Sequence, residues 1–189
     1  KMSEEEIDER LDHYDIPTDL PLVVQISRFD RWKDPEGVIR AFKIAREEVD
    51  ATLVLLGNVA TDDPEGEDIY HSLLDQEEDR IIILSKEDTA LVNALQCRAA
   101  VVLQKSIREG FGLTVSEAMW KKTPVIGGDT GGIRYQIENG KNGFLVSSVE
   151  EAAEKIVLLL GDKALCRKMG EEGRETVRER FLLSRLLEN

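Results

Sequence analysis

Leu22-Val23-Val24-Gln25-Ile26 and Thr52-Leu53-Val54-Leu55-Leu56-Gly57 are two short runs made almost wholly of apolar residues. Both runs predict strands that are buried on both faces, because neither alternates apolar and polar residues. Residues 35–49, which lie between them, are expected to form a helix. The apolar positions at roughly helical spacing are Val38, Ile39, Phe42 and Ile44. A strand, a helix and a second buried strand make up the repeating unit of a parallel sheet, so this stretch predicts an α/β fold.

The same alternation continues along the chain. Further strands are expected at 81–84, 100–103, 124–126 and 143–146. Further helices are expected at 68–76, 88–97, 114–120, 133–138, 149–160 and 163–180. At the N-terminus, Ser3 and Glu6 form a capping-box pattern that opens a helix running through Tyr14. The whole chain, residues 1–189, therefore predicts a single Rossmann-like, doubly wound parallel sheet with helices on both faces.

Composition restricts the function. The net charge of −13 disfavours nucleic acid as a partner, because phosphates would be repelled overall. No apolar run approaches the roughly 18 residues that cross a bilayer, and residues 1–6 lack the apolar core of a secretory signal, so no membrane partner and a cytoplasmic location are expected. Cys97 and Cys166 are expected to be buried thiols, and no metal site is expected, since the cysteines and histidines show no ligand spacing.

Ligands of a doubly wound sheet bind beyond the carboxyl ends of its strands, so the loops that follow strands are expected to carry the functional residues. The first such loop is Ser27-Arg28-Phe29-Asp30-Arg31-Trp32-Lys33-Asp34-Pro35. Arg28 would offer an anion a bidentate guanidinium contact, and Lys33 would add a point charge. The alternative is a solvated polar loop in which Arg31 and Trp32 pack on the surface.

The second loop contains Gly110-Phe111-Gly112-Leu113-Thr114, directly after an expected strand and at the start of an expected helix. Its glycines allow the backbone to approach a ligand closely, and the N–H groups and dipole at the helix start favour a phosphate. Glu109 and Glu117 flank this turn, and each carboxylate can accept two hydroxyl hydrogen bonds, so one can hold a ribose and the other a sugar. The alternatives are a structural turn and, for Glu117, a favourable charge near a helix N-terminus.

The third loop is Gly127-Gly128-Asp129-Thr130-Gly131-Gly132, with four glycines in six residues. This composition lets the chain pass close to something bulky. A backbone approach to ligand hydroxyls explains it, and so does a tight turn from strand to helix.

The run Arg108–Met119 resembles the E-x7-E motif of retaining GT-B glycosyltransferases, a family that includes glycogen synthases, sucrose synthases and sucrose-phosphate synthases. Ser27-Arg28 with Lys33 is similar to that family's diphosphate-binding arginine and lysine. Residues 124–132 and 139–146 resemble the segments that follow in the family, so the match spans almost the whole chain in order. Within the family, the chain looks most like the glycosyl-transferring trehalose synthases. That resemblance rests on Ile107–Leu113, Met119–Lys121 and the loop Ala60–Gly66.

The resemblance implies catalytic roles for three residues. Arg28 and Lys33 would neutralise the diphosphate as charge develops on the leaving group, a task otherwise done by a metal. Glu109 would contact the donor sugar, which would be transferred with its anomeric configuration retained.

The resemblance also implies a binding site for the donor, a nucleotide sugar such as UDP-glucose or ADP-glucose, with no further cofactor required. Ser27, Arg28 and Lys33 would line it. The backbone of Gly110, Phe111, Gly112, Leu113 and Thr114 would hold sugar and phosphate, and Glu117 would bind the ribose hydroxyls.

GT-B enzymes have a second, N-terminal acceptor domain, which this sequence lacks, so the chain is expected to bind donor and to be inactive alone. Lys1-Met2 would then lie near a domain boundary, and Arg185–Asn189 would cross back to the other domain. Self-association through the former domain interface is a further expectation. Two alternatives stay open: a GT-B sugar phosphorylase, and an engineered fragment that serves as a folding or assembly scaffold. A dehydrogenase is disfavoured, because no G-x-G-x-x-G follows the first expected strand.

Overall fold

The computed structural model describes residues 2–58 and 64–181. The strands are β1 (Leu22–Ile26), β2 (Thr52–Gly57), β3 (Ile81–Ser85), β4 (Val101–Gln104), β5 (Val125–Gly128) and β6 (Phe144–Val146). The helices are α1 (Glu4–Asp12), α2 (Pro35–Ala45), α3 (Pro64–Leu74), α4 (Thr89–Arg98), α5 (Leu113–Trp120), α6 (Gly131–Gln136), α7 (Val149–Gly161) and α8 (Lys163–Arg180). A short 3-10 turn, η1 (Arg31–Lys33), precedes α2.

The strands form one six-stranded sheet in the order β3-β2-β1-β4-β5-β6, and every neighbouring pair is parallel. Chain order reverses between β1 and β4, which are paired through Val23 with Val101 and Val24 with Val102. This is the topological switch point at which doubly wound sheets open a crevice for ligands. The order and the parallel pairing confirm the Rossmann-like α/β fold.

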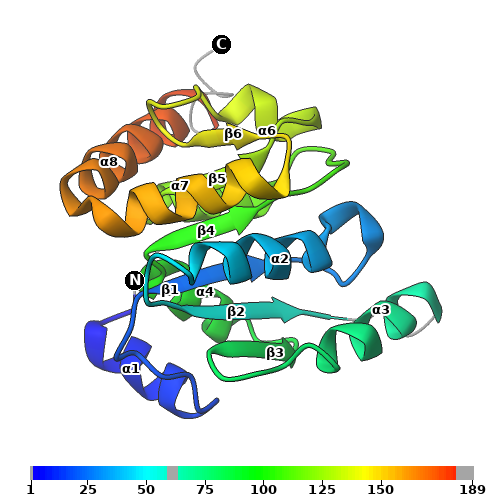
Figure 1. Cartoon of the computed structure of the whole chain (residues 1–189). Coiled ribbons are helices and arrows are strands. Elements are labelled where there is room, and N and C mark those ends of the chain that lie inside the picture. The colour runs from blue at the N-terminus through cyan, green and yellow to red at the C-terminus, as the bar shows by residue number, and fades with distance from the viewer. Residues whose placement is uncertain (1, 59–63, 182–189) are drawn as a thin grey trace.

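The sheet separates two apolar cores (Figure 1). Alternate residues of a strand face opposite sides, so Leu53 and Leu55 of β2 enter one core while Val54 and Leu56 enter the other. Helices α2 and α7 cover the first core, and α1, α4 and α5 cover the second. Helix α8 closes one end by packing against both α5 and α7. Burial on both faces is the physical reason for the continuous apolar runs in the sequence.

The capping box of α1 is confirmed: the Ser3 amide donates to Glu6 Oε2 at 2.7 Å, and the Glu6 amide donates to Ser3 Oγ at 3.2 Å. The helix ends at Asp12, two residues before Tyr14. Among the described residues, no helix combines the length and the apolar character needed to cross a bilayer.

Three details differ from the sequence predictions. The helix expected at 35–49 ends at Ala45, and Ile44 is 41% exposed although its spacing suggested burial. Cys97 is exposed and Cys166 is half-buried, so the expectation of two buried thiols is wrong. Helix α4 buries Leu91, Ala94, Leu95 and Gln96, whereas Cys97, the next residue, faces solvent.

Two predicted segments lie outside the described residues. They are positions 60–63 of the Ala60–Gly66 loop and the final run Arg185–Asn189.

Candidate functional site

The loops that follow β1 and β4 meet at the carboxyl edge of the sheet. The Ile107 amide donates to the Trp32 carbonyl at 2.8 Å, and the Arg108 amide donates to the same oxygen at 3.3 Å. The Thr114 hydroxyl donates to the Ile26 carbonyl at 3.2 Å. Residues 27–33 and 107–114, which the sequence predicted to share a site, are therefore neighbours in space.

Lys33 and Glu109 form an ion pair between these two loops. Lys33 Nζ lies 2.5 Å from Glu109 Oε2, and the two side chains are only 17% and 11% exposed. Glu109 also accepts hydrogen bonds from Ser106 Oγ at 3.3 Å and from the Gly110 amide at 3.1 Å. Gln25 Nε2 donates to the Lys33 carbonyl at 2.8 Å. Two of the three predicted catalytic residues are thus in contact, each held by further hydrogen bonds.

A second ion pair fixes the segment that carries Lys33. The Asp34 carboxylate pairs with Lys105 Nζ and accepts the Gly37 amide, which caps α2. Both partners are largely buried, with side chains 14% and 10% exposed. Just before Lys33, Asp30 Oδ1 accepts the amides of Trp32 and Lys33. Lys105 was not predicted from sequence, although its place directly after β4 was a signal for it.

The Arg28 side chain lies on the exposed side of the loop that follows β1. It is 65% exposed, and its Nη2 lies 3.3 Å from Asp30 Oδ2. Among the described contacts, none joins Arg28 to Lys33 or Glu109. Arg31 and Trp32 pack together on the surface, as the alternative for this loop predicted. The Arg31 and Arg108 guanidinium groups lie 4.5 and 5.4 Å from the Trp32 ring centre.

Helix α5 begins at Leu113 with uncapped amides. Its N-cap, Gly112, has a φ of 83° and no side chain to accept from the first turn. By contrast, the described N-caps Ser3, Asp34, Asp88, Ser148 and Asp162 accept such bonds in α1, α2, α4, α7 and α8. Unsatisfied amides at a helix start, together with the helix dipole, favour an anion.

Glu117 is the fifth residue of α5 and lies beyond the helix's first turn. Its Oε2 accepts a hydrogen bond from Gln96 Nε2 at 2.9 Å, and Gln96 Oε1 accepts from Lys121 Nζ at 2.6 Å. Glu117 is exposed and turned toward α4. The structure therefore places Glu109 with Lys33, and Glu117 with a different set of partners.

The glycines of the third loop pack against the backbone of the second. A Cβ on Gly131 would lie 1.8 Å from the Glu109 carbonyl oxygen, and a Cβ on Gly132 would lie 2.2 Å from the Gly110 oxygen. The Gly132 amide donates to that same Gly110 oxygen at 2.7 Å. The bulky neighbour that the glycines admit is thus the adjacent loop, so they shape the site through loop-to-loop packing.

A cavity of about 260 Å³ lies beside these loops. Ser27 and Thr114, both predicted from sequence, contribute to its wall, and so do Asn58, Lys86 and Asp88. The last three were missed, although they follow β2 and β3 at the same edge of the sheet. A cavity at the switch point of a doubly wound sheet is where a ligand is expected.

Asp88 gives this cavity a negative wall. Its carboxylate caps α4 by accepting the Leu91 and Ala90 amides, and it accepts the Tyr14 hydroxyl at 2.8 Å. The Leu91 amide first, then the Tyr14 hydroxyl and nearby Arg10, lower the pKa of Asp88 below its ordinary value. The carboxylate therefore remains ionised at neutral pH, while Lys86 on the same cavity wall carries the opposite charge.

Comparison with known sequences extends over nearly the whole chain. Residues 6–176 match the family described as "Glycosyl transferases group 1". Trehalose synthase from Rubrobacter xylanophilus is 46% identical over 180 residues, which cover 92% of this chain and 43% of that protein. Trehalose synthase from Thermococcus litoralis is 40% identical over 194 residues, covering 100% of this chain and 47% of that protein. Trehalose phosphorylase from Grifola frondosa is 34% identical over 174 residues, covering 82% and 24%.

Solved structures share the fold. Sucrose-phosphate synthase from Thermosynechococcus elongatus superposes with a TM-score of 0.82 at 29% identity, over 95% of this chain and 46% of that chain. HepE from Anabaena, in complex with UDP-glucose, superposes with a TM-score of 0.85 at 22% identity, over 99% and 51%. The present chain spans about half the length of the curated trehalose synthases it matches.

Proposed function

Since the chain belongs to the glycosyl transferases group 1 family, we propose that it binds a nucleoside-diphosphate glucose as the donor half of a retaining, trehalose-synthase-like glycosyltransferase. The family match agrees with the resemblance carried by Arg108–Met119. The trehalose synthases at 40 and 46% identity support the subfamily, and the UDP-glucose complex of a protein with the same fold supports the ligand. UDP-glucose and ADP-glucose are the proposed donors.

The observation that carries this proposal is the Lys33–Glu109 pair beside the uncapped start of α5. An ammonium group has several donors, so Lys33 can hold Glu109 and also donate to a phosphate oxygen. The amides that begin α5 supply further donors to the same anion. Arg28 would complete the diphosphate site by turning inward from the rim. These cations would stabilise the leaving diphosphate as its charge develops.

The remaining parts of the donor follow from this placement. Glu109, oriented by Ser106 and Gly110, would accept hydrogen bonds from the hydroxyls of the transferred sugar. Glu117 would accept those of the ribose. The cavity beside Ser27 and Thr114 would hold the base, because it adjoins the loops proposed to hold the diphosphate.

Sugar transfer itself would require a second domain. Because the chain spans about half of its curated relatives, the acceptor is proposed to bind on the other half. Closure of two domains around a donor supplies the orientation and the exclusion of water that this half alone does not.

Isothermal titration with UDP, ADP and their glucose conjugates tests the proposal. Lys33→Ala is expected to weaken binding by about 1–3 kcal/mol, the typical cost of losing a hydrogen bond to a charged group. Lys43→Ala is the matched control, because it removes the same charge from an exposed position on α2. Failure of the unmodified chain to bind any of these nucleotides at millimolar concentration would refute donor binding.

A sugar phosphorylase is the second candidate, and the 34% identity to trehalose phosphorylase favours it. Such an enzyme uses inorganic phosphate where a transferase uses a nucleotide. Phosphate alone would then raise the melting temperature more than UDP or ADP does. The opposite ranking supports the transferase.

A further inference from the structure

A second cavity, of about 480 Å³, lies at the other edge of the sheet. Pro21, Ala100 and Pro124 line it, and they directly precede β1, β4 and β5. The residues of the candidate donor site follow the same strands, so the length of the sheet separates the two places. The volume falls within the roughly 300–1,000 Å³ typical of small-molecule sites. We call this space the corner cavity, because the turn between α7 and α8 forms its other wall.

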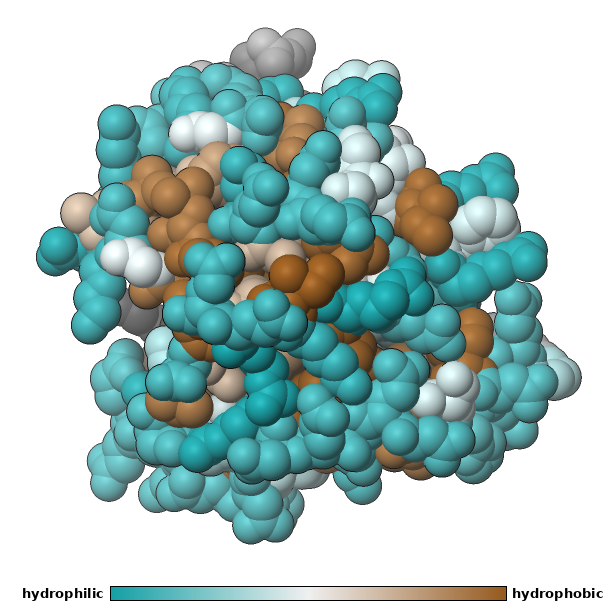
Figure 2. Space-filling model, viewed as in Figure 1, coloured by the Kyte–Doolittle hydropathy of each residue, from teal (hydrophilic) through white to brown (hydrophobic). Residues whose placement is uncertain are grey.

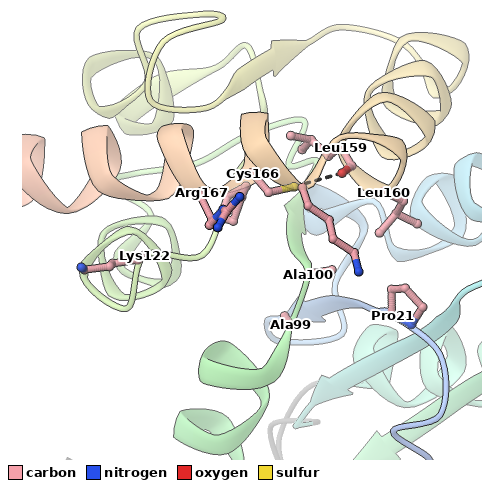
Figure 3. A pocket seen from close by; sticks show the side chains of 10 residues that line it. Pro21, Ala99, Ala100, Lys122, Leu159, Leu160, Cys166 and Arg167 are labelled. Atoms are coloured by element: carbon pink, nitrogen blue, oxygen red, sulfur yellow. Dashed lines mark hydrogen bonds between the residues drawn. The ribbon is translucent and has the colours of Figure 1, made fainter.

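The floor of the corner cavity is apolar. Leu159 and Leu160 of α7 face Pro21 and Ala100 across it (Figure 3). Figure 2 shows hydrophobic residues interrupting an otherwise hydrophilic surface along α7 and α8. An apolar ring or short chain placed here would remove this surface from water, at roughly 25 cal/mol per Å².

Two cations at the start of α8 face the same space. Lys163 and Arg167 both line the cavity and stand one helical turn apart, so they lie on one side of the helix. Neither forms an ion pair with any described residue. The nearby Asp162 carboxylate is engaged, since it caps the Ala164 and Leu165 amides. Lys122 differs, because its ammonium is paired with Glu171 at 2.7 Å and extends away from the cavity (Figure 3).

Cations without an ion pair are present elsewhere among the described residues, but Lys163 and Arg167 stand one helical turn apart beside the same cavity. A pair of them beside an apolar floor is complementary to a ligand that carries both features. We propose that the corner cavity binds a small amphipathic anion, namely an apolar ring or short alkyl chain that bears a carboxylate, sulfonate or phosphate group. The anionic head pairs with Lys163 and Arg167, and the apolar body lies on Leu159, Leu160 and Pro21. The strongly polar nucleotide sugars match the first site and not this one.

Fluorescence titration with 8-anilino-1-naphthalenesulfonate tests the proposal. Arg167→Ala is expected to weaken the affinity by about tenfold, which corresponds to about 1.4 kcal/mol. Lys168→Ala, the matched control, removes the same charge from the next residue of α8, which does not line the cavity, and it should leave the affinity unchanged. Equal affinities of the two variants would overturn the proposal.

Competition with other ligands tests the contributions of the apolar body and the anionic head separately. Octanoate and octyl phosphate are expected to displace the dye, whereas octanol and inorganic phosphate at the same concentrations are not. Displacement by octanol would show that the cations play no part, and displacement by UDP would place the dye in the other cavity. Either result overturns the proposal. The octanol result is independent of whether UDP binds the candidate donor site.

Alkylation of the two cysteines tests whether the ligand binds in the corner cavity. Cys166 lines the corner cavity, with its thiol donating to the Leu159 carbonyl at 3.0 Å (Figure 3). Cys97, by contrast, lies exposed on α4. Octanoate is expected to slow the alkylation of Cys166 by N-ethylmaleimide and to leave Cys97 unaffected. Peptide mass spectrometry reads both rates in one sample. Equal effects on the two thiols, or no effect on either, would contradict this location.

Discussion

At the scale of single residues, Asp34 combines three roles. Its backbone is left-handed, with φ 48° and ψ 51°, a conformation that costs a residue with a side chain about 1–2 kcal/mol. Its carboxylate offsets that cost by capping α2 through the Gly37 amide and by pairing with Lys105. A Cβ on Gly37 would lie 2.1 Å from Asp34 Oδ2, so a larger residue there would displace the capping carboxylate. The position of Lys33 therefore depends on its neighbour in the chain.

Replacing Lys105 with methionine should destabilise the protein. The change leaves the largely buried Asp34 carboxylate without its charged partner, so we expect the free energy of unfolding to fall by about 1–3 kcal/mol. Urea denaturation followed by circular dichroism measures it.

Lys43→Met is the control for this change, because Lys43 pairs with Glu78 at the surface, 3.6 Å away, and such pairs contribute about 0–1 kcal/mol. The double variant Lys105→Met/Asp34→Asn should lose less than the sum of its two single changes, since the residues are in contact. Additive losses would argue against the coupling.

Some of these residues are predictable from the sequence and others are not, for a physical reason. Lys33 and Glu109 were found because they follow strands whose ends share one edge of a parallel sheet. Lys105 also follows a strand, but a lysine at a strand end has the same sequence pattern whether it faces water or a carboxylate from another loop. The Arg28 contact with Asp30 was equally invisible, because a pair within one loop depends on side-chain direction.

At the scale of elements, the turn from β5 to α6 and the loop from β4 to α5 form one packed unit. Gly132→Ala should disrupt it, because the new Cβ would lie 2.2 Å from the Gly110 oxygen and 2.4 Å from Phe111 Cα. Overpacking of this kind costs about 1–3 kcal/mol, and the displaced 110–114 backbone should also bind nucleotide more weakly. Thermal unfolding and titration with UDP measure the two effects.

Gly161→Ala makes the same chemical change at the end of α7, where nothing lies within 4 Å of the new Cβ. It should leave nucleotide affinity unaltered and change stability by no more than about 1 kcal/mol. If both alanine variants behaved alike, the packing account of the glycine-rich turn would be incorrect.

The kinds and order of the elements were predictable, because buried parallel strands and amphipathic helices leave strong periodic patterns. The residues at which the helices and strands begin and end were less predictable. The helix after β1 stops at Ala45, although Val49 beyond it still packs against the first core. The strand order was not predicted, because it depends on which face each crossover helix covers.

At the scale of the whole molecule, the carboxyl edge of the sheet exposes several large apolar side chains. They are Ile107, Phe111, Leu113 and Tyr135, which are 58, 44, 67 and 72% exposed. Apolar residues grouped on one edge favour association with another surface. We therefore expect the sedimentation coefficient of this chain to rise with its concentration.

Leu113→Glu should reduce this association, because it places a charge within the exposed group. Leu158→Glu introduces the same charge on α7, at a leucine that is 42% exposed, and should have no such effect. A sedimentation coefficient that stays constant in the unmodified chain would show that this edge does not self-associate.

The contact between Lys33 and Glu109 bears on how the proposed site would empty after transfer. A diphosphate and the Glu109 carboxylate would crowd one ammonium group, and two anions so placed repel each other. In the proposed site, sugar hydroxyls that donate to Glu109 would relieve this repulsion when the intact donor is bound. After the sugar has been transferred, no sugar hydroxyl would donate to Glu109, and its carboxylate would repel the diphosphate of the remaining nucleotide. The domain would then bind the nucleotide sugar more tightly than the free nucleoside diphosphate, which would favour release of the product nucleotide.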